Sequence, residues 1–220
     1  MDLGCSGGGL VLDFILRGHR GFGVEGSDHP KGAQRAEWRV LRNNLFTADI
    51  TRPFRLSEID GGEPIQCDVI SMWEVMEHIA DEDLPGLFAN IKAHLKPDGL
   101  FIGSVALNAD DHNGASYHRT VKPQDWWQKR YAELGLPMIT DHGFVFEDFC
   151  RGTGNGPIDG SFRDDPSLGF HFVARGLQSC PAPLGARQPD TGRVPRPPSG
   201  PCRDERSGPE IQPRTHPLIG

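Results

Sequence analysis

Long apolar runs are missing from this sequence of 220 residues. No stretch approaches the ~20 consecutive apolar residues that a membrane-spanning helix needs. The N-terminus has no basic region followed by an apolar one, so it does not resemble a signal peptide. A positive charge excess is missing too, because the formal net charge is −7, which disfavours broad attraction to nucleic acid or to anionic lipid. We therefore expect a cytoplasmic protein that acts without a membrane.

Closely spaced cysteines are also missing. The sequence has five cysteines and no Cys-x-x-Cys pair. Their positions are Cys5, Cys67, Cys150, Cys180 and Cys202. This spacing indicates neither a zinc knuckle nor a disulfide framework, and it suits a reducing compartment.

Aromatic residues are missing from the last part of the chain. Residues 175–220 contain no Phe, Trp or Tyr, whereas prolines are dense. Such a segment cannot bury enough apolar surface to offset the entropy of ordering, about 1–2 kcal/mol per residue for the backbone alone. We predict a folded domain over residues 1–174 and a disordered, proline-rich tail over residues 175–220. The tail is either an extension without function or a segment that binds a partner.

Within residues 1–174, short apolar runs alternate with helical patterns. Strands are predicted at residues 22–24, 45–48, 68–71, 100–105, 144–149 and 169–174, and helices at residues 10–18, 31–41, 84–95 and 123–134. This alternation predicts an α/β fold, in which a doubly wound, mostly parallel sheet carries helices on both faces. In such sheets ligands bind beyond the carboxyl ends of the strands.

Three features at strand ends suggest a nucleotide site. The opening residues 1–9 (MDLGCSGGG) form a glycine-rich turn before a helix, which admits close backbone approach and favours anionic groups. Glu25 follows the next strand and can accept hydrogen bonds from both ribose hydroxyls of an adenosine. Asp49 follows the third strand, where it could accept a hydrogen bond from the adenine amino group. A tight structural turn and two solvated loop acids are the alternatives.

A family resemblance rests on six short motifs in a fixed order. They are residues 2–8 (DLGCSGG), 23–25 (GVE), 48–50 (ADI), 67–70 (CDVI), 74–78 (EVMEH) and 95–99 (LKPDG). In this order the chain resembles class I S-adenosylmethionine-dependent methyltransferases over residues 1–174. The resemblance implies a Rossmann-like, doubly wound, mostly parallel seven-stranded sheet. A nicotinamide-dependent dehydrogenase is a weaker match, because Ser6 occupies the middle glycine position of GxGxxG.

The resemblance also implies which residues bind S-adenosyl-L-methionine. They are Asp2, Gly4, Gly7, Glu25, Asp49, Ser71 and Met72. Asp2, Gly4 and Gly7 would hold the methionine end. Glu25 would bind the ribose, and Asp49 would bind the adenine amino group. The backbone around Ser71 and Met72 would line the space near the sulfonium.

The chain departs from the family at its start. The family brings several residues before the Asp-Leu-Gly turn, whereas here only Met1 precedes it. We therefore expect a shortened first strand, and a sequence that is a fragment or has its start codon assigned too late.

Residues 74–78 suggest a metal site. If the segment after the fourth strand is helical, Glu74, Glu77 and His78 share one face and could ligate a divalent cation such as Mg²⁺. The pattern is similar to that of metal-assisted O-methyltransferases, including ubiquinone-biosynthesis enzymes and small-RNA ribose methylases. In the latter a further histidine lies downstream, as His118 does here. The same pattern occurs in relatives with no known metal, where it caps a helix. His118 and His112 are also candidate catalytic bases.

These observations favour an enzyme that methylates a small-molecule acceptor, on oxygen. Methylation of nucleic acid or protein is the first alternative, which the negative net charge disfavours. The second is a truncated module that binds the cofactor without catalysis, which the missing first strand favours.

Overall fold

The structure is a computed structural model and describes residues 1–58, 62–112, 114–144, 146 and 165–176. These residues belong to one compact unit. None of the helices in the described part of the chain is long and apolar enough to cross a membrane. The tail predicted over residues 175–220 lies outside the described residues, apart from its first two.

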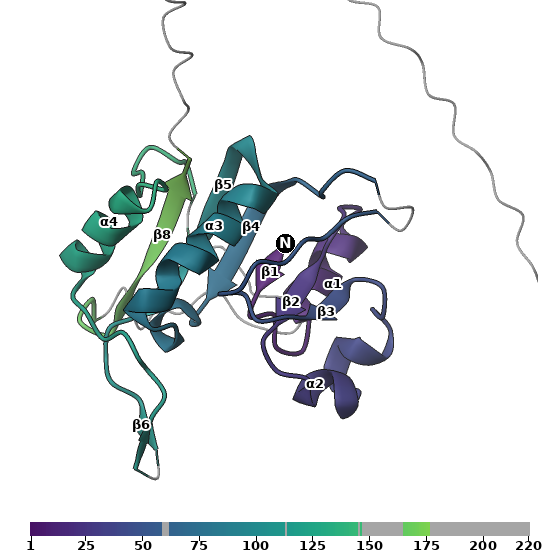
Figure 1. Ribbon diagram of the computed structural model, residues 1–220, viewed down its shortest axis with the longest axis horizontal. Coiled ribbons are helices and arrows are strands. Elements are labelled where there is room, and N and C mark those ends of the chain that lie inside the picture. Colours follow the sequence, from purple (N-terminus) through teal and green to yellow (C-terminus); the bar gives the residue numbers. More distant parts are fainter. Residues whose placement is uncertain (59–61, 113, 145, 147–164, 177–220) are drawn as a thin grey trace, which may run out of the picture. The chain divides into compact units, whose positions relative to one another are not determined.

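A six-stranded sheet forms the centre of the described unit (Figure 1). Its strands are β1 (Asp2–Leu3), β2 (Gly23–Glu25), β3 (Leu45–Thr47), β4 (Cys67–Trp73), β5 (Leu95–Ala106) and β8 (Gly169–Arg175). They lie in the order β3-β2-β1-β4-β5-β8, and all neighbours are parallel except β5 and β8. The order reverses between β1 and β4, which is where a doubly wound sheet binds its ligand.

The α/β, mostly parallel fold is thus confirmed, and β1 comprises two residues. Of the seven strands expected, the described residues contribute six to this sheet. The strand predicted over residues 144–149 falls largely on residues outside the described part.

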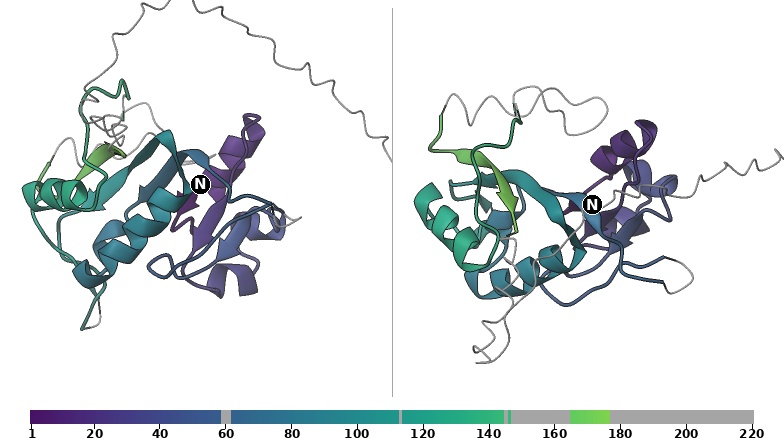
Figure 2. Two further views of the ribbon diagram at one scale, coloured as in Figure 1. Left: turned by 45° about the horizontal axis from the view of Figure 1, so that its top comes forward. Right: turned by 90° about the horizontal axis from the view of Figure 1, so that it is seen from above.

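Helices cover the sheet on both faces (Figure 2). They are α1 (Gly9–Leu16), α2 (His29–Gly32), α3 (Leu84–His94) and α4 (Gln124–Glu133), with short 3₁₀ helices η1 (Ala36–Arg39), η2 (Met76–His78) and η3 (Asp81–Asp83). Because neighbouring strand residues point to opposite faces, Phe101 packs in the same core cluster as α3 and α4, whereas Ile102 packs with Leu10 of α1. Burial on both faces explains why the central parts of β4 and β5 are mostly apolar.

Two local predictions were wrong. Residues 31–41 do not form one helix, because Gln34 and Ala36 adopt positive φ angles of 50° and 46° and separate α2 from η1. The second concerns β4, which continues to Trp73 rather than ending at residue 71. Its last residue pairs with Ser104 of β5, so the carboxyl end of this strand lies two residues later than expected.

A small hairpin between β5 and α4 was not predicted. It is formed by β6 (Asp111–His112) and β7 (Ala115–Ser116), which pair antiparallel. Gly114, with a φ of 78°, lies in the turn. The hairpin extends away from the main sheet (Figure 1).

Candidate functional site

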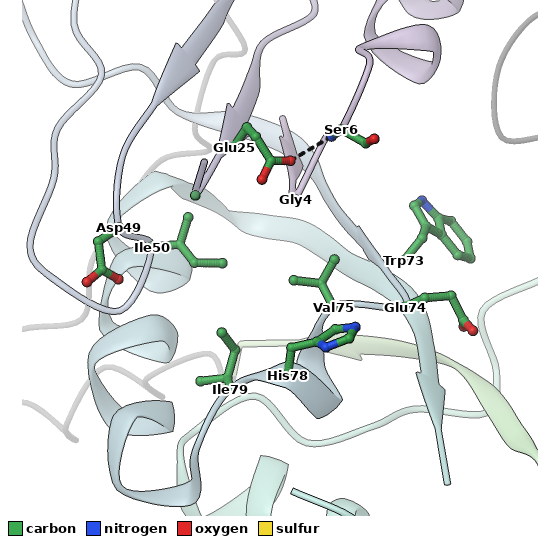
Figure 3. Close-up of a pocket in the computed structure, with 11 residues that line it drawn as sticks. Gly4, Ser6, Glu25, Asp49, Ile50, Trp73, Glu74, Val75, His78 and Ile79 are labelled. Carbon is green, nitrogen blue, oxygen red and sulfur yellow. Dashed lines mark hydrogen bonds between the residues drawn. The ribbon is translucent and has the colours of Figure 1, made fainter. Parts of the chain in front are cut away.

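A pocket of about 570 Å³ lies at the carboxyl ends of β1, β2, β3 and β4. Its lining comes from the last residues of these strands and the segments that follow them: Gly4, Ser6, Glu25, Gly26, Asp49, Ile50, Trp73, Glu74, Val75, His78 and Ile79. Figure 3 shows Glu25 and Asp49 on one side and Trp73 and Glu74 on the other. The structure therefore brings Gly4, Glu25 and Asp49 into one cavity.

The glycine-rich turn needs its glycines for packing within the protein. Gly4 has a φ of 73°, and a Cβ atom there would overlap the side chain of Val75. A Cβ at Gly7 would lie 3.0 Å from the Cβ of Ala36. Gly4 lines the pocket, whereas Gly7 is not among the lining residues. Glycine is thus required at position 4 by the positive φ and by Val75, before any ligand is considered.

Glu25 is oriented by the turn across from it. Its Oε2 accepts a hydrogen bond of 2.8 Å from the Ser6 amide, and its Oε1 accepts one of 3.2 Å from the Ser27 amide. A carboxylate can accept about four hydrogen bonds, so each oxygen retains capacity for a further donor. Two adjacent hydroxyl groups, as on a ribose, match this geometry.

Asp49 is held by the residue two positions later. Its Oδ1 accepts hydrogen bonds from the Thr51 amide at 2.9 Å and from the Thr51 hydroxyl at 2.6 Å. These two donors lower the pKa of the Asp49 carboxyl below its usual range, since they favour the charged form. The second oxygen, Oδ2, lies 4.0 Å from the Arg52 side chain, and the Asp49 side chain is exposed.

Apolar residues separate the two acids from the far side of the pocket. Ile50 and Ile79 lie between Asp49 and His78 in the close-up, and Val75 lies above His78 (Figure 3). Flat apolar rings fit between aliphatic side chains of this kind. Sequence reasoning missed these residues. The only available signal was their position directly after Asp49, Glu74 and His78.

Asp2, Ser71 and Met72 lie outside the pocket lining. Asp2 and Ser71 are buried, and the Ser71 hydroxyl donates a hydrogen bond of 2.7 Å to Asp2 Oδ1. Met72 is fully buried in the core on the α3 side of the sheet. Because β4 extends to Trp73, the residues that reach the pocket are Trp73 and Glu74 instead.

The segment after β4 is not the α-helix that would place Glu74 beside Glu77. Glu74 has a φ of 52°, and only Met76–His78 form a 3₁₀ turn. The Glu74 carboxylate accepts a short hydrogen bond from the Ser104 hydroxyl, whose oxygen in turn accepts one of 3.2 Å from the Glu74 amide. Glu74 is thereby fixed to β5 and is not part of the cluster formed by Glu77.

Glu77, His78 and His118 form a compact group, in which one ligand atom of each lies within 4.8 Å of the others. His78 Nδ1 donates to the Tyr117 carbonyl at 2.9 Å, and His118 Nδ1 donates to the Asn108 carbonyl at 2.6 Å. Each ring therefore keeps its Nε2 lone pair available. Hydrogen bonds from Nδ1 to carbonyl groups orient metal-binding histidines in the same way.

Glu77 is fully buried, with 0% of its surface exposed. Neither carboxylate oxygen has a hydrogen-bond partner among the described residues. Burial, and to a smaller extent the nearby charge of Glu74, raises the pKa of Glu77 to about 8, and the amides of Glu77 and Ala106 offset only part of this effect. Ionising a buried carboxylate without a neutralising charge is costly, so this group is suited to binding a proton or a cation.

A doubly wound sheet, a glycine turn after β1 and acids after β2 and β3 together define a class I S-adenosylmethionine-dependent methyltransferase domain. The chain belongs to the methyltransferase-domain family, whose model matches residues 1–146. It is a methyltransferase that uses S-adenosyl-L-methionine as its cosubstrate. No match was found among the curated proteins.

Solved structures show the same fold at low sequence identity. The glycopeptide N-methyltransferase MtfA is 14% identical, with a TM-score of 0.53 over 80% of this chain and 82% of that one. An S-adenosylmethionine-dependent methyltransferase from Clostridium acetobutylicum is 14% identical, with a TM-score of 0.51 over 79% and 82%. A TehB-like methyltransferase from Corynebacterium glutamicum is 17% identical, with a TM-score of 0.50 over 80% and 78%.

Proposed function

We propose that this methyltransferase transfers a methyl group to an oxygen atom of a small-molecule acceptor, next to a divalent cation held by Glu77, His78 and His118. One observation carries the proposal. His78 belongs both to the pocket lining and to the Glu77–His118 cluster, so the cluster adjoins the cofactor pocket.

In this proposal the adenosine lies on the side of the pocket formed by Glu25 and Asp49. The Glu25 oxygens accept hydrogen bonds from the ribose hydroxyls, and Asp49 Oδ2 accepts one from the adenine amino group. The methionine end lies along the turn at Gly4 and Ser6. Asp2 and Ser71 act indirectly, because their mutual hydrogen bond joins β1 to β4 directly behind the turn.

The fit of a cation rests on the buried Glu77 carboxylate, which no positively charged group among the described residues neutralises, and on the two imidazole rings with available Nε2 atoms. Two imidazoles and one carboxylate suit a first-row transition ion better than Mg²⁺, which prefers oxygen ligands. When bound, such an ion lowers the pKa of a coordinated hydroxyl group. Glu74, expected as a further ligand, is held by Ser104 and takes no part.

Methyl transfer from a sulfonium depends mainly on alignment of the nucleophile, the methyl group and the sulfur. Trp73, the last residue of β4, and Glu74 line the pocket on the side opposite the adenosine acids, where the acceptor would approach. A hydroxyl acceptor must also lose its proton. Without a cation, His118 Nε2 is the group that we propose to take that proton.

The preference for oxygen is supported by the sequence pattern of residues 74–78, which resembles that of metal-assisted O-methyltransferases, and by the position of the Glu77–His78–His118 cluster beside the pocket. The fold neighbours do not add to it, since MtfA is a methyltransferase that acts on nitrogen. The net charge of −7 supports a small molecule rather than a nucleic acid as acceptor.

Direct binding tests the cation. The protein is freed of metal with a chelator and titrated with Mn²⁺, followed by electron paramagnetic resonance. We expect one tight site in the wild type, and its loss in Glu77→Gln and in His118→Gln. His29→Gln, which changes an exposed histidine outside the cluster, serves as the control. Retention of full Mn²⁺ binding by both cluster variants would exclude the site.

Activity then tests the acceptor. Release of S-adenosylhomocysteine is measured with matched pairs of small phenols and anilines, with and without Mn²⁺. We expect turnover of hydroxyl compounds that depends on Mn²⁺. Preference for the amines contradicts the choice of oxygen, and cofactor binding without turnover of either class indicates a binding module.

A further inference from the structure

Helix α3 contains two buried polar residues on the side that faces residues 50–56, the segment that leads away from the pocket. Asn90 is 5% exposed and His94 is 1% exposed. Buried polar groups are retained in a helix only where their hydrogen bonds are satisfied. Here main-chain groups of residues 50–56 are the partners of Asn90 and one of the two partners of His94.

Asn90 holds this segment through three hydrogen bonds. Its Nδ2 donates to the carbonyl groups of Ile50 at 2.8 Å and Arg52 at 2.7 Å. Its Oδ1 accepts a longer bond of 3.4 Å from the Phe54 amide. Both amide hydrogens are thus used, and the two carbonyl acceptors determine which end of the side-chain amide is nitrogen.

His94 fixes the next part of the same segment. Its Nδ1 donates to the Asn90 carbonyl at 2.9 Å, and its Nε2 accepts a bond of 3.1 Å from the Leu56 amide. The ring of Phe54 stacks on it with centroids 4.8 Å apart. His94 therefore extends the contact that Asn90 begins.

Gly86, in the first turn of α3, touches the segment at its start. A Cβ atom at this position would overlap the Thr51 carbonyl oxygen. Thr51 in turn donates two hydrogen bonds to Asp49 Oδ1. Through Thr51, α3 is therefore connected to Asp49, which lines the pocket. Ile50 also lines the pocket, and its carbonyl group accepts a hydrogen bond from Asn90.

We infer that Asn90 and Gly86 are positioning residues that set the affinity and the base selectivity of the cofactor site through the placement of Ile50 and Asp49. The inference rests on the proposed contact of Asp49 with the adenine amino group. Neither residue touches the pocket, and Asn90 acts through its two carbonyl acceptors.

The variant Asn90→Asp changes hydrogen bonding at nearly constant volume. A carboxylate oxygen then faces the Ile50 and Arg52 carbonyl oxygens, so two attractive contacts become repulsive. The segment must shift, and Ile50 and Asp49 move with it. Gly86→Ala displaces the same segment through a steric contact at Thr51, while alanine favours the helix itself.

Calorimetry with two ligands separates positioning from a purely structural role. S-adenosyl-L-homocysteine carries the adenine amino group, whereas S-inosyl-L-homocysteine has a carbonyl oxygen at the same position. Both this oxygen and the Asp49 carboxylate are hydrogen-bond acceptors, so they cannot form a hydrogen bond with each other. We expect the wild type to prefer the adenosyl ligand. In Asn90→Asp and in Gly86→Ala, we expect about tenfold weaker binding of the adenosyl ligand. The ratio of the inosyl to the adenosyl dissociation constant should fall towards one.

Lys92→Ala is the matched control on the same helix. It removes a hydrogen bond of 3.0 Å from α3 to the Leu134 carbonyl, which lies away from residues 50–56, and it should leave both dissociation constants unchanged. Circular dichroism and melting curves establish that each variant is folded. Should Asn90→Asp not fold, Gly86→Ala decides the question.

Two results overturn the inference. One is an unchanged preference for the adenosyl ligand in the folded variants. The other is an equal loss of both ligands, which would show a general loosening instead of positioning. Asp49→Asn separates the two proposals. If Asp49→Asn lowers the preference for the adenosyl ligand while Asn90→Asp and Gly86→Ala do not, only the positioning role is wrong. If Asp49→Asn leaves this preference unchanged, the proposed adenine contact of Asp49 is wrong, and the positioning role fails with it.

Discussion

His78 and His118 meet edge to face, with ring centroids 4.8 Å apart and ring planes at 82°. The first follows β4 and the second follows the hairpin after β5, so the main sheet and its connections bring them together. Each ring is fixed at Nδ1 by a carbonyl group. The pair is therefore arranged before any ligand binds, which lowers the entropic cost of binding.

Replacing Asp49 with asparagine tests the adenine contact. Asp49→Asn should weaken binding of S-adenosylhomocysteine by about five- to tenfold, because one charge-assisted hydrogen bond is lost. Asp165→Asn is a matched control, since Asp165 accepts the same pair of bonds from the amide and hydroxyl of Ser167, at 3.0 and 2.6 Å. Calorimetry measures both. Equal weakening in the two variants would speak against a contact with adenine.

A double-mutant cycle tests the packing of the glycine turn. Gly4→Ala should destabilise the protein, by about 1–2 kcal/mol from the positive φ alone and further from overlap with Val75. Val75→Ala removes the overlapping methyl groups, so the double variant should be more stable than the sum of the single effects predicts, by about 1 kcal/mol. Urea unfolding measures the four free energies. Strict additivity would show that the overlap is relieved elsewhere.

The raised pKa of Glu77 predicts a pH-dependent stability. Between pH 4.5 and about 8 the unfolded chain releases this proton while the folded protein keeps it. The free energy of unfolding of the metal-free wild type should therefore fall as the pH rises through this window, and level off above it. Each unit of pKa shift corresponds to about 1.4 kcal/mol, so the total effect is a few kcal/mol.

Glu77→Gln removes this titration and is the reference for it. At pH 9 the free energy of unfolding of Glu77→Gln should exceed that of the wild type. This difference should be larger than the difference between the two proteins at pH 4. Chemical unfolding in the presence of a chelator at several pH values checks this. Mn²⁺ should reverse the wild-type loss at high pH, because the cation binds the ionised carboxylate. Parallel pH profiles for the two proteins would contradict the shift.

The indole of Trp38 tests the support of the turn at Ser6. Trp38 Nε1 donates a hydrogen bond of 2.8 Å to the Ser6 carbonyl, and the Ser6 amide donates to Glu25. Trp38→Phe should lower stability by about 1 kcal/mol and weaken cofactor binding several-fold. Trp126→Phe on α4 should leave cofactor binding unchanged. Thermal melting and calorimetry measure the two effects.

The sequence predicted the part of the site that depends only on strand order. Glu25 and Asp49 each follow a short apolar run, and parallel strands place their carboxyl ends at one edge. Gly4 was placed with them by the family resemblance, because only Met1-Asp2-Leu3 precedes it. The same reasoning located His78 and His118 after the strands that follow.

Errors arose where distant pairing decides the local structure. The end of β4 depends on its pairing with β5, in which Trp73 lies opposite Ser104, and the sequence near residue 71 contains no sign of it. The positive φ of Glu74 depends on the same neighbour. Likewise, the interruption of the helix predicted at residues 31–41 accompanies the insertion of Trp38 beneath a turn that lies 32 residues earlier.

Among the described residues, the hydrogen bonds that connect the hairpin β6–β7 to the rest of the protein lie at its base. Four main-chain and side-chain hydrogen bonds join residues 117–120 to residues 77–79, and the Tyr117 amide closes the base onto Asp110. The tip can therefore change in length or composition while the histidines keep their places. Substitutions at the hairpin tip should therefore leave the geometry of the His78–His118 pair intact.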